Sequence, residues 1–438
     1  MTPRLRRCLA WAAPVAAALA IAAGVVALNH LDEAPPELHT ATTPAHSALA
    51  SPAASASQVE RGAYLARAGN CAACHTARGG TAYAGGRGIT TPFGTVYSSN
   101  LTPDATTGLG RWSAWDFWRA LHNGRSKDGR LLYPAFPYPN TTRMSRGDSD
   151  ALYAYLQSLP PAEQPNRPHA LRFPYGSQLA LAGWRALYFR PGVHVDEPAR
   201  SAEWNRGAYL VRGLAHCSAC HGGRNVWGGP SAGAEFAGSL LPGAPWYAPA
   251  LTDPSEASVA HWPLNDTVAL LRDGRTADAS VLGPMAEVVY SSTQHLTAAD
   301  LRAMATYLKA LPVTRAEAEV RGADAALRAD PAARERGARH YEQHCAQCHG
   351  DSGEGAPGVY PALAGNRAVT MASPANLLRV VIEGAYLPAT AGNPRPYGMP
   401  PFRQQLSEAE IADVLTYIRG AGGNAAPPVS ALDVVRLR

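Results

Sequence analysis

The sequence has few charged side chains, which make up 17% of its 438 residues. Its 39 lysines and arginines outnumber the 34 acidic residues, but they are scattered singly and form no tract interleaved with aromatic residues. A basic tract of that kind is the usual electrostatic mark of a nucleic-acid-binding protein. The composition therefore argues against a nucleic-acid partner, and the length suggests about two to four domains.

Strand-forming patterns are sparse as well, and the sequence contains only six methionines and seven cysteines. Most of the periodic segments repeat their apolar residues at helical spacing. We therefore predict an all-α protein. The scarcity of both sulfur-containing residue types is useful, because the position of each one can be weighed individually.

The N-terminus has the pattern of a membrane-targeting segment. Arg4, Arg6 and Arg7 precede an apolar run at 8–28, and about 20 such residues match one bilayer crossing. The positive flank keeps the N-terminus cytoplasmic and directs the remainder outward. Residues 1–29 are predicted to be a signal anchor, with a cleaved signal peptide as the alternative. We expect the body to lie on the periplasmic side of the bacterial inner membrane, after a flexible Ala/Ser/Pro linker at 30–56.

Six of the seven cysteines fall into three copies of one pattern. The copies are Cys71-Ala-Ala-Cys74-His75, Cys217-Ser-Ala-Cys220-His221 and Cys345-Ala-Gln-Cys348-His349. Random placement of 7 Cys and 14 His in this length gives about 0.004 copies of the c-type haem attachment sequence. The pattern therefore predicts three covalently bound haem c groups.

The spacing within each copy fits the chemistry of haem attachment. Two thiols on one helical turn can each form a thioether with a porphyrin vinyl group, and the adjacent histidine can then bind the iron. We predict His75, His221 and His349 as proximal ligands, each donating its other ring N–H to a backbone carbonyl. Disulfides, a zinc site or a thioredoxin-like pair would leave the repeated histidine unexplained.

The similarity between copies extends beyond the cysteines. Before them stand Arg61-Gly-Ala-Tyr64, Arg206-Gly-Ala-Tyr209 and Arg336-Gly-Ala338. After them, Ser145, Thr297 and Ser407 each precede an acidic residue by three positions, which is a helix-start signal. Each repeat is predicted to open and close with a helix, with shorter helices at 113–123, 264–273 and 374–383. The predicted cytochrome c domains are 57–160, 201–313 and 331–422, the connecting segments 161–200 and 314–330, and the tail 423–438.

Methionine is the usual sixth ligand of a haem that only carries electrons. Met285 and Met399 are expected in irregular, proline-stiffened loops ahead of the closing helices of the second and third repeats, and we predict both as distal ligands. The first repeat has Phe136 in the corresponding loop. Met144 is its predicted ligand, and an open coordination site or His122 are the alternatives.

The segment between the first two repeats contains an apolar run at 179–189 that includes Trp184 and Tyr188. Two interpretations stay open. The run could be an interfacial segment that touches the membrane or a quinone, or a helix packed between domains.

The order of these motifs resembles the triheme cytochrome c subunits of bacterial membrane-bound dehydrogenases, the group that serves alcohol, gluconate and sorbitol dehydrogenases. The resemblance runs from about residue 59 to the end. It is most specific at Phe93-Gly-Thr-Val-Tyr-Ser-Ser-Asn100, Tyr133-Pro-Ala-Phe-Pro-Tyr138, Gly283-Pro-Met-Ala-Glu-Val-Val289 and Val429-Ser-Ala-Leu-Asp-Val434.

This resemblance implies that the chain passes electrons from a dehydrogenase catalytic subunit to ubiquinone or a terminal oxidase. The catalytic subunit would be a quinoprotein, a flavoprotein or a molybdenum hydroxylase. Phe136 and the stretch at 166–175 are most similar to cytochromes that accompany molybdenum aldehyde or N-heterocycle oxidoreductases. The alternative function is a multihaem enzyme, similar to a peroxidase or a thiosulfate dehydrogenase, with an open haem in the first domain.

Overall fold

The computed structural model describes Gly24 and residues 57–241, 243, 245–314 and 330–437. Apart from Gly24, the predicted signal anchor at 1–29 lies outside the described residues, as do the linker at 30–56 and nearly all of the connecting segment at 314–330. Within the described part of the chain, no helix combines the length and the apolar character needed to cross a bilayer.

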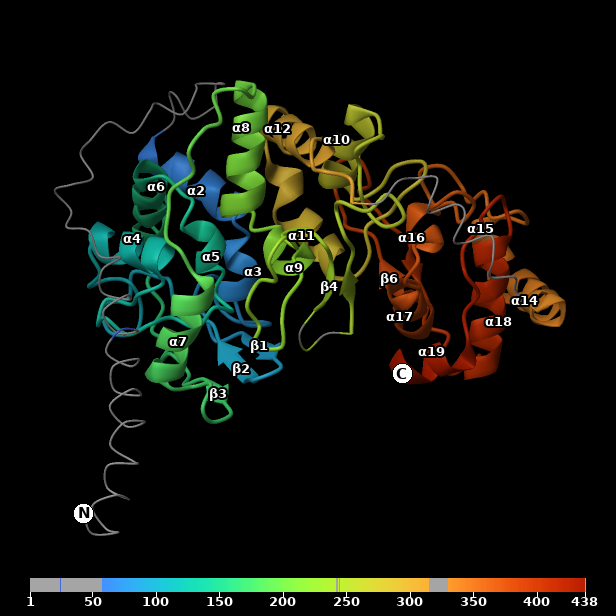
Figure 1. Cartoon of the computed structure of the whole chain (residues 1–438), viewed down its shortest axis with the longest axis horizontal. Helices are drawn as coiled ribbons and strands as arrows, with labels where there is room; N and C mark the ends of the chain where they lie inside the picture. The colour runs from blue at the N-terminus through green and yellow to red at the C-terminus, as the bar shows by residue number, and fades with distance from the viewer. Residues whose placement is uncertain (1–23, 25–56, 242, 244, 315–329, 438) are drawn as a thin grey trace, which may run out of the picture.

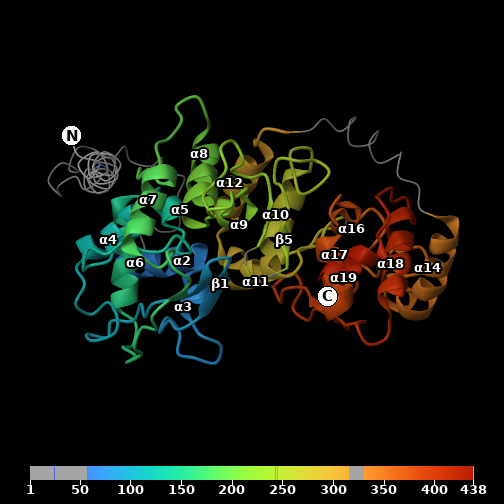
Figure 2. The ribbon, with the colours of Figure 1, turned by 60° about the horizontal axis from the view of Figure 1, so that its bottom comes forward.

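Three helix pairs, one in each repeat, form the framework. They follow one another from the blue end of the molecule to the red end (Figures 1 and 2). In each pair a glycine of the opening helix lies against the backbone of the closing helix. A Cβ atom on Gly62, Gly207 or Gly337 would come within 2.0 to 2.1 Å of a carbonyl oxygen of that helix. The Arg-Gly-Ala motif is therefore repeated because the helices cross closely at the glycine.

The first repeat packs its opening helix α2 against its closing helix α6. Its helices are α2 (Gln58–Ala68), α3 (Cys71–His75), α4 (Ala114–Asn123), α5 (Tyr138–Thr141) and α6 (Arg146–Gln157). After it, the connecting segment forms α7 (Gln178–Tyr188). The predicted middle helix at 113–123 is confirmed as α4, which Ser113 caps.

The second repeat has the same order. Its helices are α8 (Ala202–Ala208), the π-helix η3 (Tyr209–Leu214), α9 (Ser218–His221), α10 (Leu264–Asp273), α11 (Pro284–Ser291), the 3₁₀-helix η4 (Thr293–His295) and α12 (Ala298–Lys309). The third repeat and the tail contain α14 (Pro331–His344), α15 (Ala346–His349), α16 (Arg367–Thr370), α17 (Ala375–Glu383), α18 (Glu408–Gly420) and α19 (Ala431–Leu437).

The predicted starts of the closing helices are confirmed. The side chains of Ser145, Thr297 and Ser407 accept hydrogen bonds from the backbone N–H groups of Asp148, Asp300 and Glu410, at 3.2, 3.1 and 3.4 Å. Each bond satisfies one of the N–H groups that the first turn of a helix leaves without a partner.

The fold is mostly helical, as predicted, and a few short strands accompany the helices. Among the described residues, seven short strands form three small antiparallel sheets. They are β1 (Gly88–Thr91), β2 (Gly94–Tyr97) and β3 (Ala170–Leu171), then β4 (Ser239–Leu240) with β5 (Tyr247–Ala248), and β6 (Ala385–Tyr386) with β7 (Gly398–Met399). Most are two residues long, too short to leave an alternating pattern in the sequence. Strand β3 pairs with β2 and so returns the connecting segment to the first repeat.

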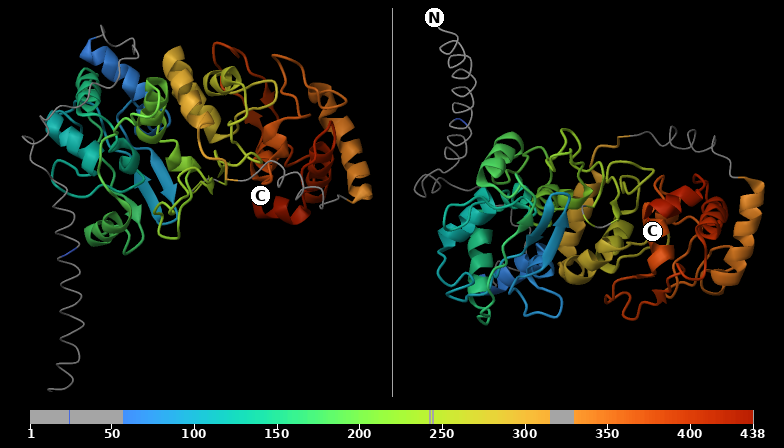
Figure 3. Two further views of the ribbon diagram at one scale, coloured as in Figure 1. Left: turned by 45° about the horizontal axis from the view of Figure 1, so that its top comes forward. Right: turned by 90° about the horizontal axis from the view of Figure 1, so that it is seen from below.

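The first two repeats share one apolar core, and the third repeat has a core of its own. One core cluster joins the first and second repeats, with Leu65 and Leu152 from the first and Leu210 and Leu301 from the second. Another is confined to the third repeat and the tail, around Tyr341. Both views of Figure 3 show the orange and red segment set apart from the blue-to-green part by the yellow one. The first two repeats are therefore fused more closely than the third is to either.

Candidate haem sites

The three Cys-x-x-Cys-His sequences form short helical turns, α3, α9 and α15, that follow the opening helices of their repeats. All six of these cysteines are free thiols. Burial raises the pKa of Cys71 and Cys217 to about 12 and that of Cys345 to about 11. The first thiol of each turn is therefore neutral and half-buried, while the second cysteine of the first two turns is exposed.

The three histidines share one environment. Nδ1 lies 2.7 Å from the Ser99 carbonyl oxygen in His75, 2.7 Å from that of Pro249 in His221, and 3.0 Å from that of Pro361 in His349. A carbonyl oxygen can only accept, so each Nδ1 carries the proton and Nε2 keeps its lone pair. Burial lowers the pKa of all three imidazoles. The predicted carbonyl partners are confirmed, and each ring has the tautomer that a metal ligand needs.

A large cavity lies beside the first attachment turn. Its volume is about 2610 Å³, well above the roughly 300–1,000 Å³ of ordinary ligand pockets. The lining includes Cys71, Cys74 and His75, and it continues into the second repeat at Cys220 and Phe236. Apolar side chains around the first turn complete the wall: Leu101, Leu109, Trp112, Phe117, Leu121, Leu152 and Leu156. An apolar space next to two thiols and a neutral imidazole fits a porphyrin.

Of the two candidate ligands for the first iron, the structure brings one to this cavity. Met144 is 0% exposed and lines the cavity together with His75 and Phe136. The ring of His122 instead stacks on Trp118, with centroids 4.5 Å apart, and its Nδ1 lies 2.8 Å from the Thr142 carbonyl oxygen. His122 is not among the lining residues. Ligation by Met144 stays a prediction.

The segments around the other two methionines differ from the expected irregular loops. Met285 lies in the first turn of α11, which starts at Pro284 after Gly283 turns the chain at φ +51°. Proline is favoured at the first helical position, so it starts a helix here. Met399 lies in β7 and pairs with Ala385 of β6. Met285 packs on the first core cluster and Met399 on the second; their ligand roles stay predictions.

Sequence reasoning missed a group of polar residues between the first two repeats. The Asp148 carboxylate binds Arg61 of its own repeat, with Nε 2.8 Å from Oδ1, and accepts a hydrogen bond from Tyr209 of the second repeat. In the reverse direction, Asp300 binds Arg206 at 2.8 Å and accepts from Tyr64 of the first repeat at 2.5 Å. The repeated Arg-Gly-Ala-Tyr motif was the available signal, but it does not state which carboxylate each tyrosine meets.

The same interface brings the first two attachment turns together. Ser291 and Ser292, which follow Met285, donate to the side-chain oxygen of Asn70 at 2.8 Å and to the carbonyl oxygen of Ala68 at 3.2 Å. Nε2 of His216 lies 3.3 Å from the Gly69 carbonyl oxygen. Burial raises the pKa of the Cys220 thiol, and the nearby Cys74 sulfur adds a smaller increase. Groups attached at these two turns would therefore be neighbours.

The second repeat reaches this arrangement through a wide helical turn. Arg206 and Cys217 are eleven residues apart, whereas Arg61 and Cys71 are ten apart. The π-helix η3 (Tyr209–Leu214) lies in this interval. A π-turn accommodates one additional residue without breaking the helix, so η3 accounts for the extra residue.

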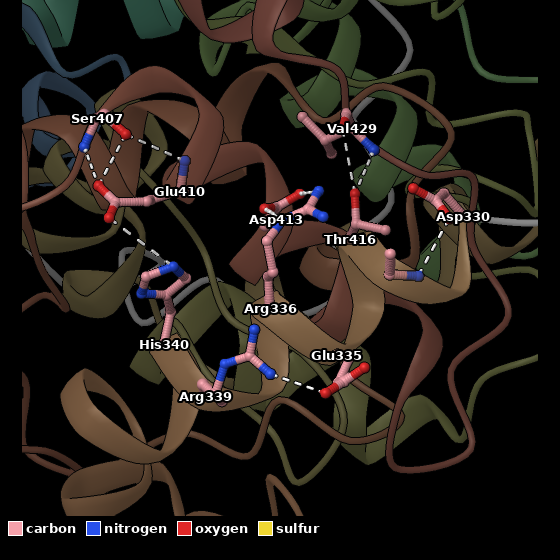
Figure 4. Close-up of polar contacts among 11 residues, drawn as sticks. Asp330, Glu335, Arg336, Arg339, His340, Ser407, Glu410, Asp413, Thr416 and Val429 are labelled. Carbon is pink, nitrogen blue, oxygen red and sulfur yellow. Dashed lines mark hydrogen bonds and ion pairs between the residues drawn. The ribbon is translucent and has the colours of Figure 1, made fainter.

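In the third repeat the corresponding residues pair within the repeat (Figure 4). At the position of Tyr64 and Tyr209 it has Arg339, which pairs with Glu335 on its own helix at 2.9 Å. Arg336 binds Asp413 at 2.6 Å, one turn beyond the capping residue Glu410. These contacts are internal to the repeat, in keeping with its separate core.

Comparison with known proteins agrees with this geometry. A sequence model of cytochrome c matches residues 59–160 and 334–422. The cytochrome c subunit of the quinone-dependent alcohol dehydrogenase of Gluconacetobacter polyoxogenes is 39% identical over 403 residues, which is 88% of this chain and 85% of that protein. The chain belongs to the family of cytochrome c subunits of bacterial dehydrogenases. Membership implies covalently bound haem c and a role in electron transfer.

Two further family relatives extend the comparison. The gluconate 2-dehydrogenase cytochrome c subunit of Pantoea cypripedii is 38% identical over 407 residues, covering 89% of this chain and 92% of the relative. A nicotinate dehydrogenase subunit of Pseudomonas putida is 43% identical over 370 residues, 83% of this chain, and the chain spans 30% of the length of that relative.

Proposed function

We propose that the chain is a three-haem electron relay on the periplasmic side of the inner membrane. It would accept electrons from a dehydrogenase catalytic subunit and deliver them to ubiquinone or a terminal oxidase. Covalently bound haem c would supply the reversible one-electron chemistry. Cys71 and Cys74, Cys217 and Cys220, and Cys345 and Cys348 would hold the three groups in three cytochrome c domains, 57–160, 201–313 and 331–422.

One observation carries this proposal. Each of the three turns combines two free thiols with an imidazole whose Nδ1 is bonded to a backbone carbonyl group. These bonds fix the ring orientation and the tautomer, which limits reorganisation when the metal changes charge. Met144, Met285 and Met399 would complete the coordination.

The catalytic partner is proposed to be of the type that oxidises N-heterocycles. The support is the 43% identity to a nicotinate dehydrogenase subunit, since nicotinate is an N-heterocycle, together with Phe136 in the first-repeat loop. The membrane location rests on the apolar run at 8–28. Reduction of the purified cytochrome by a co-expressed molybdenum hydroxylase and its substrate would test the partner; reduction only by a quinoprotein would contradict it.

Haem content is tested on the whole chain, expressed with haem-attachment machinery and then denatured. Intact mass should show three added haems, and each paired variant, Cys71→Ala with Cys74→Ala and the two equivalents, should remove one. A pair whose replacement leaves the haem mass unchanged would show that its repeat carries none.

An enzyme with an open first haem is the second candidate. Its support is Phe136, which lines the cavity and occupies the loop position at which a ligand methionine is expected. Carbon monoxide distinguishes the two functions. A relay with three six-coordinate haems should not bind it under mild conditions, whereas binding at one haem would favour the enzyme.

A further inference from the structure

Helix α7 buries Leu181 and Ala182 against Leu131 and also exposes large apolar side chains. Its one charged residue, Arg185, is 2% exposed, whereas Leu179 and Leu187 are 63% and 72% exposed. A helix on the surface of a soluble domain normally turns its apolar stripe inward and its charges toward water. The outward leucines therefore point to an environment other than water.

Specific contacts fix the helix in this orientation. One Nη of Arg185 donates to the Asn123 carbonyl oxygen at 2.6 Å, and its guanidinium lies over the ring of Phe189 at 4.6 Å. At the other end, the side-chain amide of Gln178 bonds to both backbone groups of Leu131, at 2.7 and 3.2 Å. Rotating α7 to bury Leu179 and Leu187 would break these contacts. The fold therefore keeps these two side chains exposed.

Other exposed apolar side chains surround α7. Phe173 precedes the helix and is 93% exposed, and Val226 and Trp227 are 85% and 58% exposed. Trp227 lies beside α7, because its carbonyl oxygen accepts from the Trp184 indole at 3.1 Å. We call Phe173, Leu179, Leu187, Val226 and Trp227 the apolar patch. Helix α7 and strand β3, which flank it, lie at the lower edge of the molecule in Figure 1.

The chain segment that carries α7 has charged side chains of one sign. No Asp or Glu occurs from residue 164 to residue 195, a stretch that contains four arginines. Arg172 and Arg190 are exposed at either end of α7. Exposed apolar side chains can insert among the acyl chains of a bilayer surface, and the arginines beside them can bind its anionic headgroups. Trp and Tyr side chains, here Trp184 and Tyr188, are also favoured at that boundary.

We propose that the apolar patch docks the protein on an anionic lipid surface. This inference rests on the proposed location at the inner membrane and adds a second, peripheral contact to the predicted anchor. Leu187, Val226 and Trp227 also line the large cavity that reaches His75 and Met144. Docking would thus bring the entrance of this cavity to the lipid, within reach of a membrane-soluble electron acceptor.

The test is hydroxyl-radical footprinting of the full-length holoprotein in lipid nanodiscs that contain phosphatidylglycerol. Oxidation of Phe173 and Trp227 is compared with that of Tyr386 and Tyr290, which are 74% and 57% exposed. We expect a loss of oxidation in the patch and none at the reference tyrosines, because side chains inserted at the headgroup boundary are removed from water. Oxidation equal to that of the reference tyrosines would overturn the proposal.

Paired variants show whether the patch itself is responsible. Leu179→Asp with Leu187→Asp should restore oxidation of Phe173 and Trp227, and Leu432→Asp, at a 56% exposed position of α19, should not. Equal protection in phosphatidylcholine nanodiscs would contradict the role of anionic lipid. Protection that appears only when a catalytic subunit is added would show that the apolar patch binds a protein partner and not lipid. Haem mass and electron transfer, measured on the same samples, report separately on the proposed relay.

Discussion

The hydroxyl group of Tyr64, in the first repeat, donates a 2.5 Å hydrogen bond to Asp300, a residue 236 positions away in the second repeat. Tyr209 makes the reverse contact with Asp148. Each carboxylate therefore has an arginine from its own repeat and a tyrosine from the other. The two haem-attachment turns lie in the interface that this exchange helps to hold.

Removal of one tyrosine hydroxyl should weaken this interface. Hydrogen bonds to charged groups contribute about 1.5–3 kcal/mol, so Tyr64→Phe should lower the free energy of unfolding by about this amount. Urea unfolding of the holoprotein, followed by fluorescence, measures the change. Tyr386→Phe, at a 74% exposed position, is the control and should have little effect. Equal unfolding curves for the two variants would contradict the assigned role.

The glycine at the helix crossing should not tolerate a side chain. In Gly62→Ala the added carbon would meet the Ala151 carbonyl oxygen at 2.0 Å, and overpacking of this kind costs about 1–3 kcal/mol. Gly147→Ala is a matched control on α6, because a Cβ there meets nothing within 4 Å; it should be neutral or stabilising. Thermal unfolding compares them, and a larger loss in Gly147→Ala would disprove the crossing argument.

Replacement of the predicted sixth ligand should change one haem only. In Met144→Leu the thioether is lost, so the reduction potential of that haem should fall and carbon monoxide should bind to it. His122→Gln is the control and should leave both properties unchanged. Redox titration combined with carbon monoxide difference spectra measures them. The opposite pattern, a change in His122→Gln and none in Met144→Leu, would identify His122 as the sixth ligand.

Acid should weaken the contact between the first two repeats. Burial by itself would raise the pKa of Asp300, but the bonds from Arg206 and Tyr64 outweigh it, and the pKa lies below its usual value. A carboxylate with a lowered pKa stabilises the fold above its unfolded pKa of about 3.9, and this contribution is lost as the pH falls through the folded pKa.

The pH dependence of unfolding tests this relationship. Between about pH 5 and pH 2, the wild-type protein should lose stability more steeply than Asp300→Asn, which has no carboxylate to protonate. Asp128→Asn, which changes a 63% exposed side chain, should follow the wild type. Parallel slopes for the wild type and Asp300→Asn would show that this carboxylate makes no such contribution.

Sequence reasoning succeeded where the signal is local. The caps at Ser145, Thr297 and Ser407 are formed within four residues, so the pattern alone predicted where α6, α12 and α18 begin. It failed for α11, because Pro284 reads equally as a loop stiffener and as a helix start. The Tyr64 to Asp300 contact left no local trace, since the two residues meet only through the packing of two repeats. The orientation of α7 was undecided for a similar reason: it depends on where Arg185 finds its carbonyl partner.

The π-helix η3 has a consequence for variation in chain length. Successive residues of a regular helix are separated by about 100° around its axis. Without the wide turn, the extra residue before Cys217 would rotate both sulfurs by that angle and aim them away from the first repeat. A homologue that lacks one residue here needs a regular helix to present its thiols in the same direction. A single insertion or deletion between Arg206 and Cys217 that no wide turn accommodates would therefore change the direction in which the second cofactor projects from the helix. The Cys-x-x-Cys-His motif itself would stay unchanged.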